Sequence, residues 1–293
     1  MDLRPDYKQI EALYEARRTP DRIIAHYALE RQLANELRNS TRAERDAGLY
    51  QTAYERLLSG LPDHPRKTLH FGARAARMQK YVERQVAMLT REVGVGDVFM
   101  DLGGGDCRVA VGVAPHVAKA IVVDVNDALV PEMLPPNFEF VKNHGVDIPL
   151  RTESVSFVYS SQLMEHLHPD DALEQLGEVF RVLKPGGRYL CRTPNRVSGP
   201  HDVSMFFSEV AQGMHLKEYS YKELDPILHH AGFARTRVWI APRAFRAFTL
   251  PQFAAELIEA GFAAVPRRFH TKICRSHVAR ALLGITMMAE KPV

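Results

Sequence analysis

The sequence has few cysteines and no long apolar run, and each absence excludes a class of protein. The three cysteines, Cys107, Cys191 and Cys274, are widely spaced and contain no C-x-x-C pair, so we expect reduced thiols rather than disulfides or a zinc site. No apolar stretch approaches the roughly 20 residues that cross a bilayer, and the charged start "MDLRPDYKQI" lacks the apolar region of a signal peptide. We therefore expect a cytoplasmic protein without a transmembrane segment.

Neither sign of charge is in excess. The 293 residues include 38 Lys and Arg against 35 Asp and Glu, a formal net charge of +3, and the chain contains no block of like charges. Proteins that bind nucleic acid usually carry a basic excess or a basic stripe. We therefore expect no nucleic-acid partner, and the 46% of hydrophobic residues are enough for a sizeable core.

Two sequence textures divide the chain near residue 95. Residues 6–60 and 74–93 are rich in Ala, Arg, Glu and Leu at near-helical apolar spacing, which predicts a helical N-terminal extension over residues 1–94. Over residues 95–293, short apolar runs alternate with stretches that can hold helices, as in a doubly wound α/β fold with a mostly parallel sheet. We expect seven strands, at "DVFMDL", "AIVVDV", "FEFVKN", "SFVYSS", "GRYLCRTP", "RTRVWI" and "GITMMAEKP".

Residues 99–108 read "FMDLGGGDCR", with three consecutive glycines directly after the first apolar run. A glycine run weakens a strand or helix, so this position must require a bare backbone. In parallel sheets, ligands bind at the carboxyl ends of strands, where glycines permit close approach and the next helix offers N–H groups to an anion. Asp124 ends the second run, 23 residues beyond Asp101, a spacing typical of a carboxylate that holds ribose hydroxyls.

These features predict a cofactor that contains ribose. Arg108 occupies the position of the third glycine in the dinucleotide pattern G-x-G-x-x-G, which argues against NAD. The alternative is a tight structural turn beside a surface carboxylate.

Five motifs in register narrow the choice of cofactor. "VFMDLGGGDC", "VVDVN", "GVDIPL", "FVYSSQLMEHL" and "FRVLKPGGRYLCRTPN" resemble class I S-adenosylmethionine-dependent methyltransferases, most closely the branch that contains the ubiquinone and menaquinone biosynthesis enzymes. The resemblance covers residues 95–195 and implies a Rossmann-like methyltransferase fold, S-adenosylmethionine as cofactor and S-adenosylhomocysteine as product. It implies that Asp101, Gly103 and Gly105 contact the methionine part of the cofactor, and that Asp124 and Val125 contact the ribose. It also implies that Asp147 and Ile148 border the adenine, and that Ser161 and Gln162 line the pocket at the end of the fourth strand.

The sequence departs from the family pattern at two positions. Cys107 stands where the family usually has a third glycine, so this residue must accept the local backbone or the loop is reshaped. Ser156 replaces an aspartate that usually precedes the fourth strand and has a structural role, so little is lost there. The segment "LKPGG", residues 183–187, is implied to be a structural turn into the fifth strand.

Histidines beyond the fourth and fifth strands are the candidates for a general base. They are His166 in "EHLHPDD", His201 beside Asp202, and His215 in "GMHLKEYS". Each also has a structural interpretation: His166 would serve the loop fold, and the other two would be ordinary cap or surface histidines. No H-x-x-x-H spacing or carboxylate cluster is present, and the adjacent His229 and His230 would point apart, so we expect no metal.

The segment from about 196 to 272 is interpreted as a helical insert on the side of the methyl acceptor. Within it, "SYKELDPILHHAGF" predicts a helix with Ser220 as N-cap, Glu223 three residues on and Gly232 at its end. The aromatic and basic stretch 243–283 would form a lid, or an amphipathic surface for a membrane or an anionic substrate. The simpler interpretation is a helical subdomain that packs its Phe and Leu residues inward.

Three functions stay open at this point. Polar His, Asp and Asn side chains in the acceptor loops favour methylation of a small molecule at a hydroxyl, on a sugar or another hydroxylated metabolite. A methyltransferase for RNA or protein is the second, although "SSQL" stands where an N-P-P-Y type tetrad would be expected for RNA. The third is a cofactor-binding scaffold without catalysis. The sequence does not predict an oligomeric state.

Overall fold

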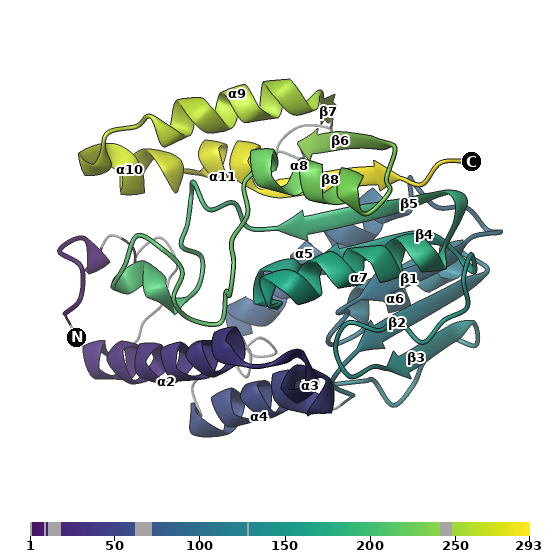
Figure 1. Cartoon of the computed structure of the whole chain (residues 1–293), viewed down its shortest axis with the longest axis horizontal. Helices are drawn as coiled ribbons and strands as arrows, with labels where there is room; N and C mark the ends of the chain where they lie inside the picture. Colours follow the sequence, from purple (N-terminus) through teal and green to yellow (C-terminus); the bar gives the residue numbers. More distant parts are fainter. Residues whose placement is uncertain (1, 9, 11–18, 62–71, 128, 241–247) are drawn as a thin grey trace.

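The computed structural model describes residues 2–8, 10, 19–61, 72–127, 129–240 and 248–293. In this part of the chain the strands form one sheet, in the order β3-β2-β1-β4-β5-β8-β6-β7 (Figure 1). The first five are mutually parallel, whereas β8 runs antiparallel to both β5 and β6, and β7 runs antiparallel to β6. The strands are β1 (Val98–Leu102), β2 (Lys119–Asp124), β3 (Phe138–Lys142), β4 (Val155–Ser161), β5 (Leu183–Thr193), β6 (Arg235–Ile240), β7 (Phe248–Leu250) and β8 (Ile285–Glu290).

The predicted α/β fold is confirmed, and the seven predicted runs all form strands. The strand count was wrong by one, because β7 adds a short edge strand that pairs with Val238–Ile240 of β6. Three residues are too few to show the alternation that marks a strand in a sequence. The pairing of β4 with β5 jumps from Leu183 to Arg188, so the predicted turn at 184–187 bulges out of the sheet, with Gly186 at a φ of +74°.

Helices cover both faces of the sheet (Figure 1). Successive residues of a strand point to opposite faces, so Phe99 of β1 packs under α5 and α6, whereas Met100 faces the core shared with α7, α8 and the N-terminal helices. The helices are α2 (Pro20–Asn39), α3 (Arg42–Glu44), α4 (Tyr50–Gly60), α5 (Gly72–Leu89), α6 (Arg108–Val113), α7 (Pro169–Val182), α8 (Tyr221–His230), α9 (Gln252–Ala263), α10 (Arg267–Cys274) and α11 (His277–Leu283), with shorter turns at η1 (Arg45–Leu49), η3 (Ala114–His116), η4 (Met164–His166) and η5 (Val203–Phe206).

The helix predicted around residues 220–232 is confirmed in detail. Ser220 and Glu223 form a reciprocal capping box at the start of α8, and Gly232 follows its end at a φ of +107°. The predicted stretch 243–283 contains β7 and α9 to α11, apart from residues 243–247, which lie outside the described residues. No helix in the described ranges has the length and apolar character needed to cross a membrane.

Candidate functional site

The glycine loop after β1 has a left-handed backbone at three positions. Gly103 and Gly105 have φ values of +72° and +53°, and Cys107 has a φ of 62°. The third glycine of the family pattern is thus replaced by a residue that does accept the local backbone, as the sequence required. A Cβ added at Gly104 would lie 2.9 Å from Val122 Cγ1, whereas one at Gly105 would meet nothing within 4 Å. The loop therefore packs tightly beneath and is open above, where a ligand can approach its backbone.

Asp124, at the end of β2, faces this loop. The Gly105 backbone N–H donates to its Oδ2 at 2.8 Å, and the Asn126 N–H donates to its Oδ1 at 2.9 Å. Both carboxylate oxygens are thereby oriented, and each keeps lone pairs for a further donor. This is the arrangement that a pair of ribose hydroxyls requires.

Three carboxylates, those of Asp101, Asp106 and Asp124, surround the loop. Burial, together with the negative charges of Asp124 and Asp106, raises the pKa of Asp101 to about 8. Arg108 pairs with Asp106 and leaves the region acidic. A ligand with a positive charge fits this environment, and S-adenosylmethionine carries both a sulfonium and an ammonium group.

The other predicted cofactor residues lie along the same edge of the sheet. Asp147 is exposed, whereas the side chain of Ile148 is buried in the core and its N–H donates to Glu178. Of the two, the Asp147 side chain is therefore the one accessible to a ligand. Val125 follows Asp124 and is half-buried.

Ser161 is the last residue of β4, and Gln162 follows it. Both take part in a hydrogen-bond network that the sequence did not reveal. Tyr81 of α5 lies 3.0 Å from Ser161 Oγ, and Arg192 donates to Tyr81 and to Gln85. Arg192 was the available signal, because it is the charged residue within the apolar run "YLCRTP" of β5. Gln162 adopts a φ of +58°, with its N–H bonded to the Arg192 carbonyl.

A cavity of about 200 Å³ opens beyond the ends of β4 and β5. Strand ends, the loop after β5 and the start of β8 form its wall, on which both polar and apolar atoms are exposed. The lining residues are Gln162, Arg192, Thr193, Pro194, Asn195, Ser198, His201, Arg280, Gly284 and Ile285.

His201, one of the predicted bases, lies in the cavity wall. Its Nε2 is 3.2 Å from the Asn195 carbonyl oxygen, an acceptor, so Nε2 carries the proton and the lone pair is on Nδ1. Burial outweighs the charge of Glu218 and lowers the pKa of His201 to about 4. The imidazole is therefore neutral at neutral pH and is a weak base.

The other two predicted bases meet behind the cavity. The rings of His166 and His215 are in edge contact, with centroids 4.9 Å apart. His166 Nδ1 lies 2.9 Å from the Met214 carbonyl, and His215 Nδ1 lies 2.7 Å from Glu218. Burial lowers the pKa of His215, but the hydrogen bond to Glu218 and the nearby carboxylates outweigh burial and raise it to about 9. A protonated His215 cannot accept a proton.

The N-terminal helices hold this acceptor side in place. Arg38 of α2 donates to the carbonyls of Gln212, Gly213 and His215, and Glu30 accepts from the Met214 N–H. Sequence analysis missed these contacts because the partners are more than 170 residues apart. The loop of residues 194–220 consequently runs between α2 and the group α9 to α11 (Figure 1).

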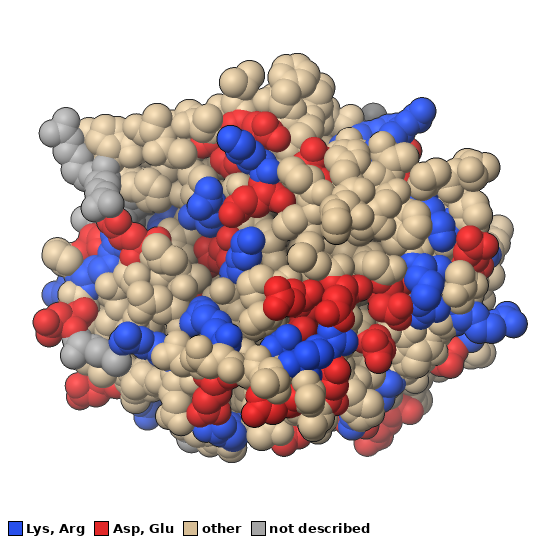
Figure 2. Space-filling view, viewed as in Figure 1, with Lys and Arg blue, Asp and Glu red and all other residues tan. Residues whose placement is uncertain are grey.

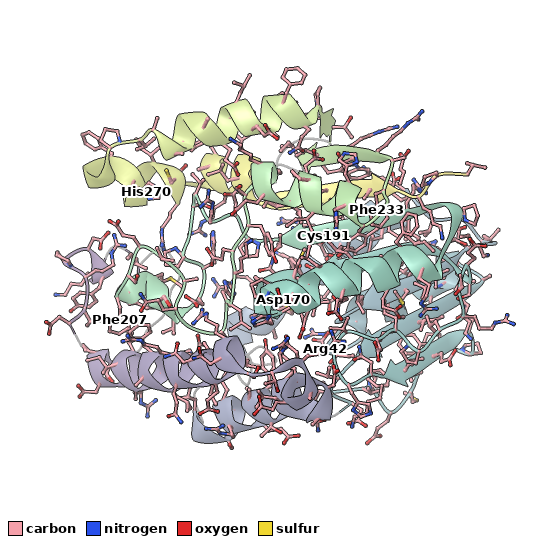
Figure 3. All side chains as sticks on the ribbon, viewed as in Figure 1. Arg42, Asp170, Cys191, Phe207, Phe233 and His270 are labelled. Carbon is pink, nitrogen blue, oxygen red and sulfur yellow. The ribbon has the colours of Figure 1, made fainter. Side chains whose placement is uncertain are left out.

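A buried ion pair joins the same helices to α7. Arg45 donates to both carboxylate oxygens of Asp171, at 2.7 and 2.8 Å, and the Tyr50 hydroxyl donates to Asp171 at 2.6 Å. Figure 3 shows the neighbouring Arg42 close to the start of α7, where Asp170 lies. The start of α7 follows Glu165 and His166 directly, so this ion pair fixes the segment that carries them.

Acidic and basic side chains are intermingled on the face shown in Figure 2. That face has no continuous basic stripe over the N-terminal helices or α7. It thus offers no extended electrostatic track for a nucleic-acid backbone.

Residues 100–191 match the family described as methyltransferase domain. A protein of Mycolicibacterium smegmatis named "Probable S-adenosylmethionine-dependent methyltransferase" is 30% identical over 142 residues, which cover 47% of this chain and 52% of that protein. A ubiquinone/menaquinone biosynthesis C-methyltransferase of Brucella suis is 29% identical over 130 residues, which cover 40% of this chain and 47% of that protein. The chain thus spans about half the length of these curated relatives.

Solved structures agree on the fold. The 1,6-didemethyltoxoflavin-N1-methyltransferase of Burkholderia thailandensis, crystallised with 1,6-didemethyltoxoflavin and S-adenosylhomocysteine, superposes with a TM-score of 0.51 at 15% identity. The superposition covers 87% of this chain and 92% of that one. This superposition confirms the predicted fold, whereas the family match over residues 100–191 and the curated relatives confirm the resemblance predicted from the five motifs.

Proposed function

We propose that this chain transfers the methyl group of S-adenosylmethionine to a hydroxyl of a small molecule. Its residues 100–191 form a class I S-adenosylmethionine-dependent methyltransferase domain. The observation that carries the proposal is the position of Asp124. Its carboxylate, oriented by two backbone N–H groups, faces the glycine loop at the carboxyl end of β1, and a cavity with hydrogen-bonding groups in its wall opens beyond β4 and β5.

The chain's own residues would bind and orient the cofactor. Asp124 would accept hydrogen bonds from the ribose hydroxyls, and Gly103 and Gly105 would let the methionine part approach the backbone. The ionised carboxylate of Asp124 would stabilise its positive charge, because Asp101 is protonated at neutral pH and Asp106 is paired with Arg108. Val125, the Asp147 side chain, Ser161 and Gln162 would border the remainder, with Ile148 packed behind Asp147. When bound, S-adenosylmethionine supplies an electrophilic methyl group on a cationic sulfur.

The cavity beyond β5 would hold the acceptor. Its amide, hydroxyl, imidazole and guanidinium groups would hydrogen-bond a hydroxylated metabolite such as a sugar. Methyl transfer is an in-line displacement, so the main task of the protein is to hold the acceptor oxygen at attack distance from the methyl group. Neutral His201, in the wall, would orient the hydroxyl and accept its proton only weakly.

Calorimetric titration tests the cofactor part of the proposal. Purified protein is titrated with S-adenosylmethionine, S-adenosylhomocysteine and NAD, and the first two should bind whereas NAD should not. Asp124→Ala removes charge-assisted hydrogen bonds worth about 1.5–3 kcal/mol each, so the affinity should fall at least about tenfold. Asp127→Ala is the matched control, because Asp127 is an exposed carboxylate three residues on that pairs with Lys142. Equal affinity in both variants would show that Asp124 does not hold the ribose.

The acceptor is tested by incubating the protein and labelled cofactor with panels of hydroxylated metabolites, RNA and protein. Label should enter a small molecule as an alkali-stable methyl ether, and His201→Gln should lower turnover without changing cofactor affinity. Label on carbon, as the name of the Brucella relative describes for that protein, would retain the methyltransferase but reject the hydroxyl acceptor. Cofactor binding with no turnover on any panel would favour the non-catalytic scaffold.

A further inference from the structure

Glu165, His166 and His215 offer one potential ligand atom each, and these three atoms lie within 4.8 Å of one another. Among the described residues, these three side chains form the group of His, Cys, Asp or Glu that lie close enough together to hold a metal ion. Two of the three come from η4 and the third comes from the loop before α8, so the fold assembles a set that the sequence keeps 49 residues apart. We propose that this cluster is a binding site for a divalent transition-metal ion.

The outer contacts of both histidines are those of metal ligands. Ligating imidazoles usually donate the N–H of one ring nitrogen to a carbonyl or carboxylate, which directs the lone pair of the other nitrogen to the metal. His166 Nδ1 lies 2.9 Å from the Met214 carbonyl oxygen, and His215 Nδ1 lies 2.7 Å from the Glu218 carboxylate. The remaining nitrogen, Nε2, is therefore the ligand atom that each ring offers, and at His215 a bound ion would take the place of the Nε2 proton.

Glu165 supplies the third ligand. Its side chain is fully buried, its Oε2 accepts from the Thr193 hydroxyl at 2.9 Å, and its Oε1 has no hydrogen-bond partner. A buried carboxylate oxygen without a partner is costly, and a bound cation removes that cost. The carboxylates of Asp202 and Glu218 add to the negative charge around His215.

The donor set selects the class of metal. Two imidazoles and one carboxylate suit Zn²⁺, Co²⁺, Fe²⁺ or Mn²⁺ better than Mg²⁺, which prefers oxygen ligands. Tetrahedral Zn²⁺ with bonds of about 2.1 Å places its ligand atoms about 3.4 Å apart, so ligand atoms that lie within 4.8 Å of one another need to approach by up to about 1.4 Å. Three protein ligands leave a fourth position for water or substrate.

The site lies one side chain behind the proposed acceptor cavity. Thr193 lines the cavity and hydrogen-bonds Glu165. If the proposed function holds, the positive charge of the ion, one side chain away from the acceptor, would favour loss of the proton of the acceptor hydroxyl, a task for which His201 is too weak a base. The C–S bond of the cofactor then breaks as the C–O bond forms, the neutral thioether leaves, and the hydroxyl proton passes to solvent.

Metal binding is measured without S-adenosylmethionine, so the result does not depend on turnover. Chelator-treated protein is titrated with Zn²⁺ by calorimetry and with Co²⁺ by visible absorption, with Mg²⁺ as a comparison. We expect one ion per chain, Co²⁺ bands of a four- or five-coordinate site, and little response to Mg²⁺. No binding of Zn²⁺ or Co²⁺ to the native chain would overturn the proposal.

Variants locate the ion. Glu165→Gln and His215→Gln should each weaken Zn²⁺ binding at least about tenfold, and Glu218→Gln should do so through its hydrogen bond to His215. His229→Gln is the control: this histidine of α8 also has a carboxylate neighbour, Asp225, but lies outside the cluster. Unchanged Zn²⁺ affinity in both Glu165→Gln and His215→Gln, in proteins with native circular dichroism, would also overturn the site.

The metal site and the proposed function fail separately. Metal bound at the cluster with no affinity for S-adenosylmethionine would leave the site and reject the methyltransferase. Binding of S-adenosylmethionine without binding of any metal ion would leave the methyltransferase and reject the metal site.

Discussion

Two regions at the carboxyl ends of the strands are built by different means: the proposed cofactor site around the glycine loop and Asp124, here the cofactor edge, and the proposed acceptor site around the cavity beyond β4 and β5, here the acceptor edge. At the cofactor edge, Asp124 and the glycine loop contact each other through backbone N–H groups within about 20 residues of sequence. At the acceptor edge, His166 and His215 are contacted by residues that reach across the fold from α4 and α2. The comparison shows that a site built by contacts between residues close in sequence can be predicted from a motif. A site built by contacts between residues distant in sequence becomes visible only in the structure.

The largest expected effect comes from breaking the ion pair under the acceptor edge. Arg45→Met removes the cation that hydrogen-bonds the nearly fully buried carboxylate of Asp171 and leaves only Arg42, 3.7 Å away, so the free energy of unfolding should fall by about 3 kcal/mol. Urea denaturation measures this. Arg56→Met removes the partner of Glu36 in an exposed pair of the same helices and should cost at most about 1 kcal/mol. Equal losses in the two variants would mean that burial of the pair is irrelevant.

The next effect belongs to the cofactor edge and depends on pH. Asp101 has a raised pKa of about 8 in the folded chain, so its contribution to stability is complete below the pKa of the unfolded chain and is lost as pH rises through 8. From pH 5.5 to 7.5, the free energy of unfolding should fall by about 1.4 kcal/mol per pH unit relative to Asp101→Asn. Parallel urea titrations of the two proteins give this difference. A difference that stays constant with pH would contradict the shift.

A more selective change separates the two edges. Arg38→Met removes the donor to three carbonyls of the acceptor loop, at a cost of about 2 kcal/mol. Amide hydrogen exchange of residues 211–216 should accelerate, whereas that of β1 should not change. Arg31→Met, at an exposed position of the same helix, is the control. Faster exchange throughout both regions would show that the edges are not independent.

The smallest change in stability tests the open side of the glycine loop. Gly105→Ala places a Cβ on a left-handed residue and should cost about 1 kcal/mol, while weakening S-adenosylmethionine binding far more than this strain alone explains. Gly177→Ala, in the exposed middle of α7 with nothing within 4 Å of the new Cβ, should instead stabilise by about 0.5–1 kcal/mol and leave affinity unchanged. Thermal denaturation and calorimetry measure both. Unaltered affinity in Gly105→Ala would place the cofactor elsewhere.

The same division explains what the sequence could predict. The parallel strands and the capping box of α8 depend on neighbouring residues, and each was found from a local pattern. For Cys107 the sequence left two outcomes open, a left-handed backbone or a reshaped loop, and the structure shows the first. The meeting of His166 with His215, and the support from Arg38, depend on how distant loops pack. Spacing rules for metal ligands search within one helix or loop, so they could not find a set shared by η4 and a segment 49 residues later.

The position of β8 sets an order of events during synthesis. This strand, residues 285–290, pairs with β5 on one side and β6 on the other, so the two halves of the sheet cannot join before it leaves the ribosome. The nascent chain can complete β1 to β5 and the glycine loop earlier, while the edge of β5 waits unpaired and exposed to intermolecular pairing. Gly284 and Ile285 form part of one wall of the cavity. The proposed acceptor pocket is therefore completed after the glycine loop.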